Sequence, residues 1–278
     1  MGDSPKRVPF GLLHAHPFQN PDQGPTVKYA GLVEYDGADF AGWAMQPGLR
    51  TVEGTLAEAL GTVLRQPVKL TVAGRTDAGV HATGQVVSFR AETSLSPSSI
   101  SYKTTAVLPE DVALRRCIWV SEDFDVRSSA RSRSYEYRVI NDPIRSPLSR
   151  RRAIHVAREL DPGLLREAAS LIRGIHEFRA FTYTKSYHTR FERAVEESRW
   201  EARDGLLVYE ITANSFLYGM VRTLVGTMLE VGGGRRKITQ LARLLDGGER
   251  KEAGPAAPAQ GLTLVAVGYD ELDFGGIT

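Results

Sequence analysis

Chemically capable side chains are concentrated in one short segment of the sequence, Gly74–Thr83. A guanidinium, a carboxylate and an imidazole, those of Arg75, Asp77 and His81, stand there beside two glycines, which permit a ligand to approach the backbone closely. A loop between strands usually needs Gly and Asp only for its turn, so the run Asp77-Ala78-Gly79 by itself would indicate turn chemistry. The density of functional side chains exceeds that need, and we expect a ligand site in this loop.

The residues alone leave more than one chemistry open to Asp77. Its carboxylate could act as a nucleophile. It could instead ligate a metal ion together with His81, although two ligands without further clustered His or Cys are weak support for a metal site. A phosphatase with an aspartate nucleophile would carry a second acid two residues later, where this chain has Gly79. We therefore expect a nucleophilic carboxylate and no metal.

A second candidate is one charge in an apolar segment. Arg222 is the only charged residue between Asn214 and Leu229, and the spacing predicts a long helix over 216–231 that is apolar on nearly every face. Such a helix is buried, and an unpaired buried guanidinium costs several kcal/mol. We expect Arg222 to pair with a carboxylate, either in a purely structural salt bridge or with Asp77 in the loop above.

The net charge of +2, from 35 basic and 33 acidic residues, hides an uneven distribution. Residues 127–158 contain nine arginines and two acids, which gives that segment +7 and leaves −5 for the rest. Arginine pairs bidentately with phosphate and stacks on bases. An exposed, solvated charge run is the ordinary alternative. If the arginines instead bind a ligand, the segment predicts a nucleic-acid partner.

Length and composition set the class of protein. A chain of 278 residues with 42% hydrophobic residues predicts about two domains. The single cysteine, Cys117, excludes an internal disulfide framework and a Cys-rich metal centre. There is no apolar run near the ~18 residues that a membrane span needs, and no signal-peptide core. We expect a cytoplasmic protein that does not contact membranes.

The pattern of elements predicts an α+β fold of two similar halves. We expect a mobile tail over residues 1–26, an N-terminal α+β domain over 27–130 that carries the catalytic loop, and a C-terminal α+β domain over 131–272. Each half would be a mostly antiparallel sheet backed by helices, with a catalytic cleft between them. The expected strands are Lys28–Asp36, Val68–Ala73, Gly84–Phe89, Ser134–Ile140, Arg193–Arg203 and Leu206–Thr212, and helices begin after Thr51, after Asp161 and at Phe216.

The loop sequence Gly74-Arg75-Thr76-Asp77-Ala78-Gly79-Val80-His81-Ala82, followed by Gly84-Gln85-Val86, resembles the signature loop of the tRNA pseudouridine synthase A (TruA) family. The similarity continues along nearly the whole chain after the tail. It departs from the family pattern at Thr105, where Asn is common, and at Asp125, where His is common. The other matching motifs are Glu34-Tyr35-Asp36-Gly37, Phe40-Ala41-Gly42-Trp43, Gln46, Leu108-Pro109, Phe124, Arg127, Arg133-Ser134-Tyr135-Glu136-Tyr137, Gly174-Ile175-His176, Phe178, Phe181, Met220-Val221-Arg222, Val225-Gly226, Ala257-Pro258-Ala259 and Gly261-Leu262.

This resemblance implies a pseudouridine synthase-like fold and an isomerase that needs no cofactor. The enzyme would convert uridine to pseudouridine at positions 38, 39 and 40 of the tRNA anticodon stem-loop. Asp77 would be the nucleophile, by attack on the ribose C1′, by addition to the base or by abstraction of a ribose proton. Arg222 would pair with Asp77 and keep its carboxylate ionised. Tyr135 would stack on the flipped uracil.

The resemblance also implies how the substrate is held. We expect substrate contacts from Tyr135, Arg75, Arg127, Arg133 and Arg190, and contacts of the 127–158 arginines with the tRNA backbone. A homodimer would bind the body of the tRNA on one subunit while its anticodon arm enters the cleft of the other. The alternative is a non-catalytic RNA-binding protein of the same fold, which would account for the arginines and aromatic residues but not for Asp77.

Overall fold

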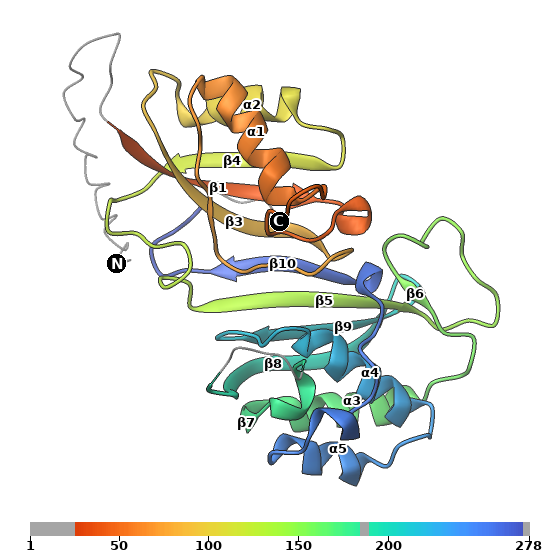
Figure 1. Ribbon diagram of the computed structural model, residues 1–278. Coiled ribbons are helices and arrows are strands. Elements are labelled where there is room, and N and C mark those ends of the chain that lie inside the picture. The colour runs from red at the N-terminus through yellow and green to blue at the C-terminus, as the bar shows by residue number, and fades with distance from the viewer. Residues whose placement is uncertain (1–25, 184–188, 275–278) are drawn as a thin grey trace, which may run out of the picture.

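The computed structural model describes residues 26–183 and 189–274, which form one continuous mixed sheet with helices packed against it (Figure 1). Its strands lie in the order β4-β1-β3-β10-β5-β9-β8-β7, with β2 paired to β3 and β6 paired to β5. Among these residues no helix is long and apolar enough to cross a membrane. The strands are β1 (Val27–Tyr35), β2 (Thr71–Val72), β3 (His81–Ala91), β4 (Val112–Trp119), β5 (Ser132–Ile140), β6 (Ile154–His155), β7 (Gly174–Glu177), β8 (Glu192–Arg203), β9 (Leu206–Ala213) and β10 (Leu262–Gly268); the helices are α1 (Val52–Leu64), α2 (Pro97–Val107), α3 (Pro162–Ile172), α4 (Met220–Gly232) and α5 (Ile238–Leu245).

The N-terminal half contains β1 to β4 with α1 and α2. Helix α1 begins after Thr51, whose side chain accepts a hydrogen bond from the backbone N–H of Gly54. Its apolar residues recur at helical spacing and share one buried cluster with β1 and β3. Those residues are Val52, Leu56, Leu60 and Leu64.

The C-terminal half contains β5 to β9 with α3, α4 and α5. Asp161 caps α3 by accepting from the N–H groups of Gly163 and Leu164, and Pro162 occupies the first turn, as the sequence predicts. The predicted β8–β9 hairpin is confirmed: both turn residues, Asp204 and Gly205, have positive φ. The core of this half lies between the sheet and the three helices.

Strand β10 joins the two halves into one sheet. It pairs antiparallel with β5 and parallel with β3, where Thr263 lies opposite His81. The backbones approach closely at Gly84, since a Cβ there would lie 2.1 Å from the carbonyl oxygen of Val265. The joining strand therefore comes from the C-terminal end of the chain, and the domain division at residue 130 stays a prediction.

The structure corrects several of the predicted elements. The helix expected over 216–231 begins only at Met220, because Gly219 adopts a left-handed conformation with φ of 70° and residues 215–219 form a loop. The strand expected over Val68–Ala73 shortens to β2. Helices α2 and α5 and strands β4, β6, β7 and β10 were not predicted at all. Of the tail expected over 1–26, only Thr26 lies within the described residues.

Replacing a helical glycine by alanine should have opposite effects on stability at two positions, because Gly226 in α4 packs against segment 253–258 and Gly61 in α1 does not. A Cβ at Gly226 would lie 1.8 Å from the carbonyl oxygen of Pro255, whereas one at Gly61 in α1 would meet only ordinary contacts. We expect Gly226→Ala to lower the free energy of unfolding by about 1–3 kcal/mol, and Gly61→Ala to raise it by up to about 1 kcal/mol. Urea unfolding measures both, and equal effects would contradict this packing.

Candidate active site

A cleft of about 810 Å³ lies between the two halves. Its N-terminal wall comes from loop 41–46 and from residues 70–80, and its C-terminal wall comes from residues 215–222 and Arg193. Tyr135 and Arg133 on β5 and Leu262 on β10 line it where β10 joins the two halves of the sheet. The cleft expected from the sequence is present, and it contains the loop that carries Asp77.

Backbone and side-chain bonds fix the Asp77 loop in place. The hydroxyls of Tyr35 and Thr76 lie 2.7 Å apart, and the Thr76 carbonyl accepts from the N–H of Trp43 at 3.0 Å. The Gln85 amide donates to the carbonyl of Gly74 at 2.7 Å. Asp77 therefore sits on a loop that β1, β3 and the chain at Trp43 hold in place.

Arg222 pairs with Asp77, as the sequence predicts. Its Nη1 lies 3.0 Å from Oδ2 of Asp77, and its Nε donates to the carbonyl of Ala257 at 2.8 Å. The N–H of Ala257 donates in return to the carbonyl of Arg222 at 2.8 Å. The guanidinium is thus oriented by the chain segment before β10 and directed at the carboxylate.

Burial and charge act on Asp77 in opposite directions. The side chains of Asp77 and Arg222 are only 16% and 18% exposed. Burial raises the pKa of Asp77, and the charge and hydrogen bond of Arg222 oppose that rise without cancelling it. Arg222 therefore limits the rise in the Asp77 pKa, in the direction that the sequence argument gave, but burial has the larger effect.

Tyr135 contributes an aromatic wall near the ion pair. Its ring meets Phe216 edge-on, with centroids 5.1 Å apart and an interplanar angle of 88°. Burial, and to a lesser extent the charge of Asp77, raise the pKa of its phenol. Phe216, from the loop before α4, was not singled out in the sequence and is a further aromatic lining residue.

The predicted substrate-binding arginines divide into three groups. Arg75 and Arg127 are exposed and line the cleft. Arg133 also lines it but is buried, and its terminal nitrogens donate to four backbone carbonyls, those of Ala73, Arg127, Ala130 and Asn214. Arg190 is exposed and is not among the cleft-lining residues, whereas Arg193, which the sequence argument did not name, is one of them.

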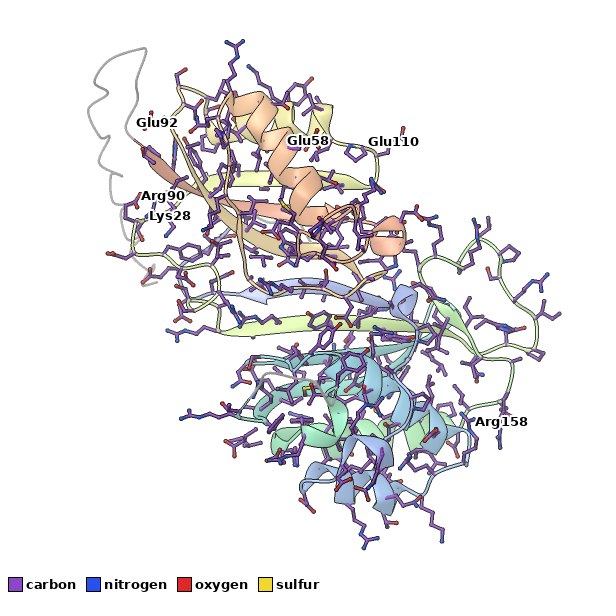
Figure 2. All side chains as sticks on the ribbon, viewed as in Figure 1. Lys28, Glu58, Arg90, Glu92, Glu110 and Arg158 are labelled. Carbon is purple, nitrogen blue, oxygen red and sulfur yellow. The ribbon has the colours of Figure 1, made fainter. Side chains whose placement is uncertain are left out.

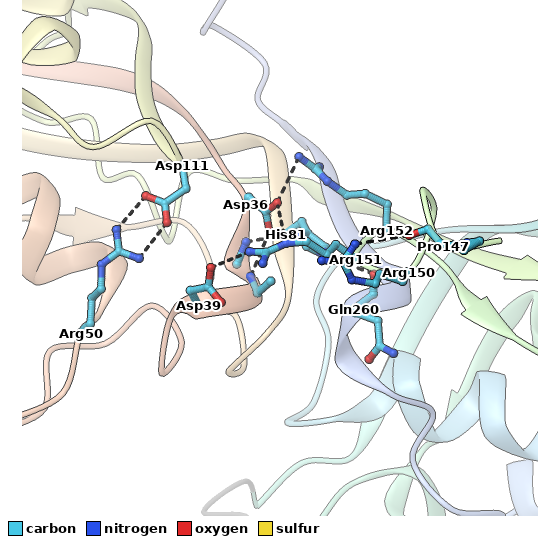
Figure 3. Close-up of polar contacts among 12 residues, drawn as sticks. Asp36, Asp39, Arg50, His81, Asp111, Pro147, Arg150, Arg151, Arg152 and Gln260 are labelled. Atoms are coloured by element: carbon cyan, nitrogen blue, oxygen red, sulfur yellow. Dashed lines mark hydrogen bonds and ion pairs between the residues drawn. The ribbon is translucent and has the colours of Figure 1, made fainter. Parts of the chain in front are cut away.

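The arginines of segment 127–158 do not form one free positive surface. Arg131 pairs with Asp270 at 2.7 Å, and Arg138 pairs with Glu136. Arg151 pairs with Asp39 at 2.6 Å, and Arg151 and Arg152 both lie 3.7 Å from Asp36 (Figure 3). Arg158 extends outward from the C-terminal half (Figure 2). Acids from elsewhere therefore neutralise part of the charge that the sequence count assigned to this segment.

His81, considered above as a metal ligand with Asp77, is a fully buried residue of the fold. Its Nδ1 lies 3.1 Å from the backbone nitrogen of Gly37 and from Oδ1 of Asp36, and its Nε2 lies 3.2 Å from the carbonyl of Gln260 (Figure 3). Burial lowers its pKa, which favours the neutral ring with Nε2 as donor and Nδ1 as acceptor. His81 thus links the N-terminal half to the segment before β10. Residues 26–183 and 189–274 bring no three His, Cys, Asp or Glu side chains together as a metal site.

Comparison with known proteins matches this chain to a class of RNA-modifying enzymes. Residues 168–270, which include Arg222, match a family model described as tRNA pseudouridine synthase. The chain is 36% identical over 238 residues to the tRNA pseudouridine synthase A of Acetivibrio thermocellus, covering 86% of this chain and 98% of that one. It is 36% identical to that of Stenotrophomonas maltophilia (88% and 96% covered) and 38% identical to that of Xanthomonas campestris pv. campestris (87% and 95% covered).

The protein is accordingly a tRNA pseudouridine synthase, an isomerase of α+β fold. Within that class, the chain belongs to the tRNA pseudouridine synthase A family.

The opposing effects on Asp77 predict a pH dependence for Arg222 variants. Without the guanidinium nothing opposes burial, so the pKa of Asp77 rises further and the acid limb of the rate profile moves to higher pH. We expect Arg222→Gln to lower the single-turnover rate at neutral pH by about 10²-fold or more, and Arg222→Lys to lose less. Rates measured across pH check this, and an unshifted acid limb in Arg222→Gln would contradict it.

Proposed function

We propose that this enzyme isomerises uridine at positions 38, 39 and 40 of the tRNA anticodon arm, with Asp77 as the nucleophile. The observation that carries the proposal is the partly buried Asp77–Arg222 pair in an arginine-lined cleft. The reaction breaks the glycosidic C1′–N1 bond, turns the uracil and forms a C1′–C5 bond; C5 loses its proton to water and N1 takes one up. It needs no change of oxidation state, so one carboxylate suffices. A tRNA substrate also agrees with the cytoplasmic location expected from the sequence.

The bonding of Asp77 supports this role. Arg222 binds Oδ2 only, and within the described residues Oδ1 makes no hydrogen bond. Asp77 lines the cleft, and a carboxylate oxygen without a described protein partner is available to attack C1′, to add to the base or to take a ribose proton. All three uses require the ionised carboxylate, which Arg222 favours against burial.

Tyr135 supports the flipped base in this proposal. A uracil that leaves the anticodon stem loses a few kcal/mol of stacking, and stacking on an aromatic ring returns roughly 1–3 kcal/mol. Phe216 meets the Tyr135 ring nearly at a right angle and limits its rotation, and both rings line the cleft. The ring would thereby hold the detached uracil near C1′ while it turns.

The exposed arginines of the cleft would bind the RNA backbone. Arg75 comes from the catalytic loop and Arg127 from the segment before β5, so two separate segments of the N-terminal half offer them to the substrate. Arg133, with its donors on carbonyls, would act by holding Arg127 and the end of β9 in place. Arg190 would contact RNA outside the cleft, and binding should weaken steeply with salt.

The proposal includes a homodimer in which the tRNA body rests on one subunit and the anticodon arm enters the cleft of the other. Loop 141–153 extends beyond the sheet beside β6 and carries Ile144 and Leu148, which are 78% and 97% exposed (Figure 1). A second subunit would cover these apolar side chains. Sedimentation velocity at micromolar protein tests this part.

Release of tritium tests the proposed reaction. Transcripts of one tRNA, each with uridine tritiated at C5 at position 38, 39 or 40 only, are incubated with the enzyme, and we expect tritium to enter water from each. A transcript labelled in its acceptor stem is the control and should release none. If binding occurs without release from any anticodon-arm uridine, the proposed site of modification is wrong.

Stacking by Tyr135 predicts different losses for two substitutions. Tyr135→Phe keeps the aromatic face and should bind a stem-loop RNA as the wild type does. Tyr135→Leu removes it, and the loss of roughly 1–3 kcal/mol should lower kcat/KM by about 10- to 100-fold. Steady-state kinetics of both variants check this, and equal kcat/KM values for Leu and Phe would argue against stacking.

A further inference from the structure

Arg193 is a half-buried arginine of the cleft wall without a counter-charge. It lies near the start of β8 and lines the cleft from the C-terminal half. Within the described residues it forms no ion pair with a carboxylate, and burial lowers its pKa. The two other arginines of β8, Arg199 and Arg203, both pair with glutamates. Arg193 is therefore the one arginine of this strand that no described carboxylate neutralises.

The hydrogen bonds of Arg193 leave one edge of its guanidinium unused. Nη1 donates to the carbonyls of Arg190 and Glu192, at 3.0 and 2.6 Å. Nε is buried and has no partner, and Nη2 makes no hydrogen bond to a described residue. The Nε–Nη2 edge is the side of the fork that binds two oxygens of one anion. An orphaned buried donor in a native structure usually has a reason, and a ligand that completes it is one such reason.

The surroundings of Arg193 favour an anion. Asn214 bonds to the backbone of Ala194 on one side, and its carbonyl accepts from Arg133 on the other. Arg133 in turn holds the carbonyl of Arg127. The guanidinium of Arg133 thus lies at the end of β9, beside the residue that follows Arg193.

The two acids that line the cleft do not compensate this charge. Asp77 is paired with Arg222, and Glu53 accepts from the N–H of Met45 at 2.9 Å and forms no described ion pair with an arginine. Neither acid therefore pairs with the guanidinium of Arg193.

We propose that Arg193 binds one phosphodiester of the RNA through its Nε–Nη2 edge, within the cleft that holds the target uridine. The inference rests on the proposed function and adds a phosphate-binding subsite to it. A phosphodiester presents two oxygens at the spacing of that edge, which matches its two donors. The carbonyls of Arg190 and Glu192 fix the guanidinium before the RNA arrives, so less side-chain freedom is lost on binding.

The test is a double-mutant cycle between the arginine and single RNA phosphates. Anticodon stem-loops are made with one neutral methylphosphonate at each position in turn, and their affinities are measured at equilibrium for wild type and Arg193→Gln. We expect one position near the target uridine to cost the wild type about tenfold in Kd and the variant less than twofold, since the contact is already absent. Arg199→Gln on the same strand removes the same charge from an exposed ion pair and should behave as wild type.

Additive losses at every phosphate would overturn the proposal. If Arg193→Gln does not fold, Arg193→Lys replaces it in the double-mutant cycle. Lysine keeps the charge without the two-donor edge, so the coupling to the phosphate should fall at least threefold. Coupling as strong as that of the wild type would also overturn the proposal. Tritium release by the wild type is measured with the unmodified stem-loop in parallel. Release without coupling rejects the subsite alone, and absence of release rejects the proposed function independently.

Discussion

The ion pair between Asp77 and Arg222 depends on the loop that carries Asp77, on helix α4 and on the strand that joins the two halves. The two residues are 145 positions apart and come from opposite halves of the chain. Asp77 lies on a loop fixed by β1 and β3, and Arg222 lies in the first turn of α4. The contact exists only because β10 joins both halves in one sheet, so the fold brings together two charges that neither half could bury alone.

The segment before β10 holds Arg222 in position for its contact with Asp77. Ala257 orients Arg222 through two hydrogen bonds, and the neighbouring Pro258 carbonyl accepts from the buried Tyr137 hydroxyl at 2.7 Å. Gly226 allows α4 to approach Pro255 to a distance that no side chain permits. Close packing therefore sets the position of the guanidinium, and a shift of this segment would be transmitted directly to the carboxylate.

The sequence revealed the charged pair more readily than the architecture around it. Arg222 was identifiable because a lone charge in an apolar segment must pair with an opposite charge. Asp77 was identifiable because its loop contains more functional side chains than a turn requires. The start of α4 was missed because Gly219 overrides an apolar pattern that runs on without a break. Strand β10 was missed although Leu262–Gly268 is rich in strand-forming residues, and its place between β3 and β5 could not be predicted because that pairing is entirely non-local. Charge counting failed for segment 127–158 because Asp36, Asp39 and Asp270 lie far from it in sequence.

The central claim is that Asp77 acts in the chemical step and not only in holding the fold. Asp77→Asn keeps the size and shape of the side chain and removes its charge, so its single-turnover rate and its Kd for the tRNA separate the two roles. The account predicts a rate at least 10⁴-fold below wild type, a loss of the order seen when a group essential to the chemical step is removed, with a Kd within about twofold. A rate within tenfold of wild type, or a loss of rate matched by an equal loss of binding, would contradict it.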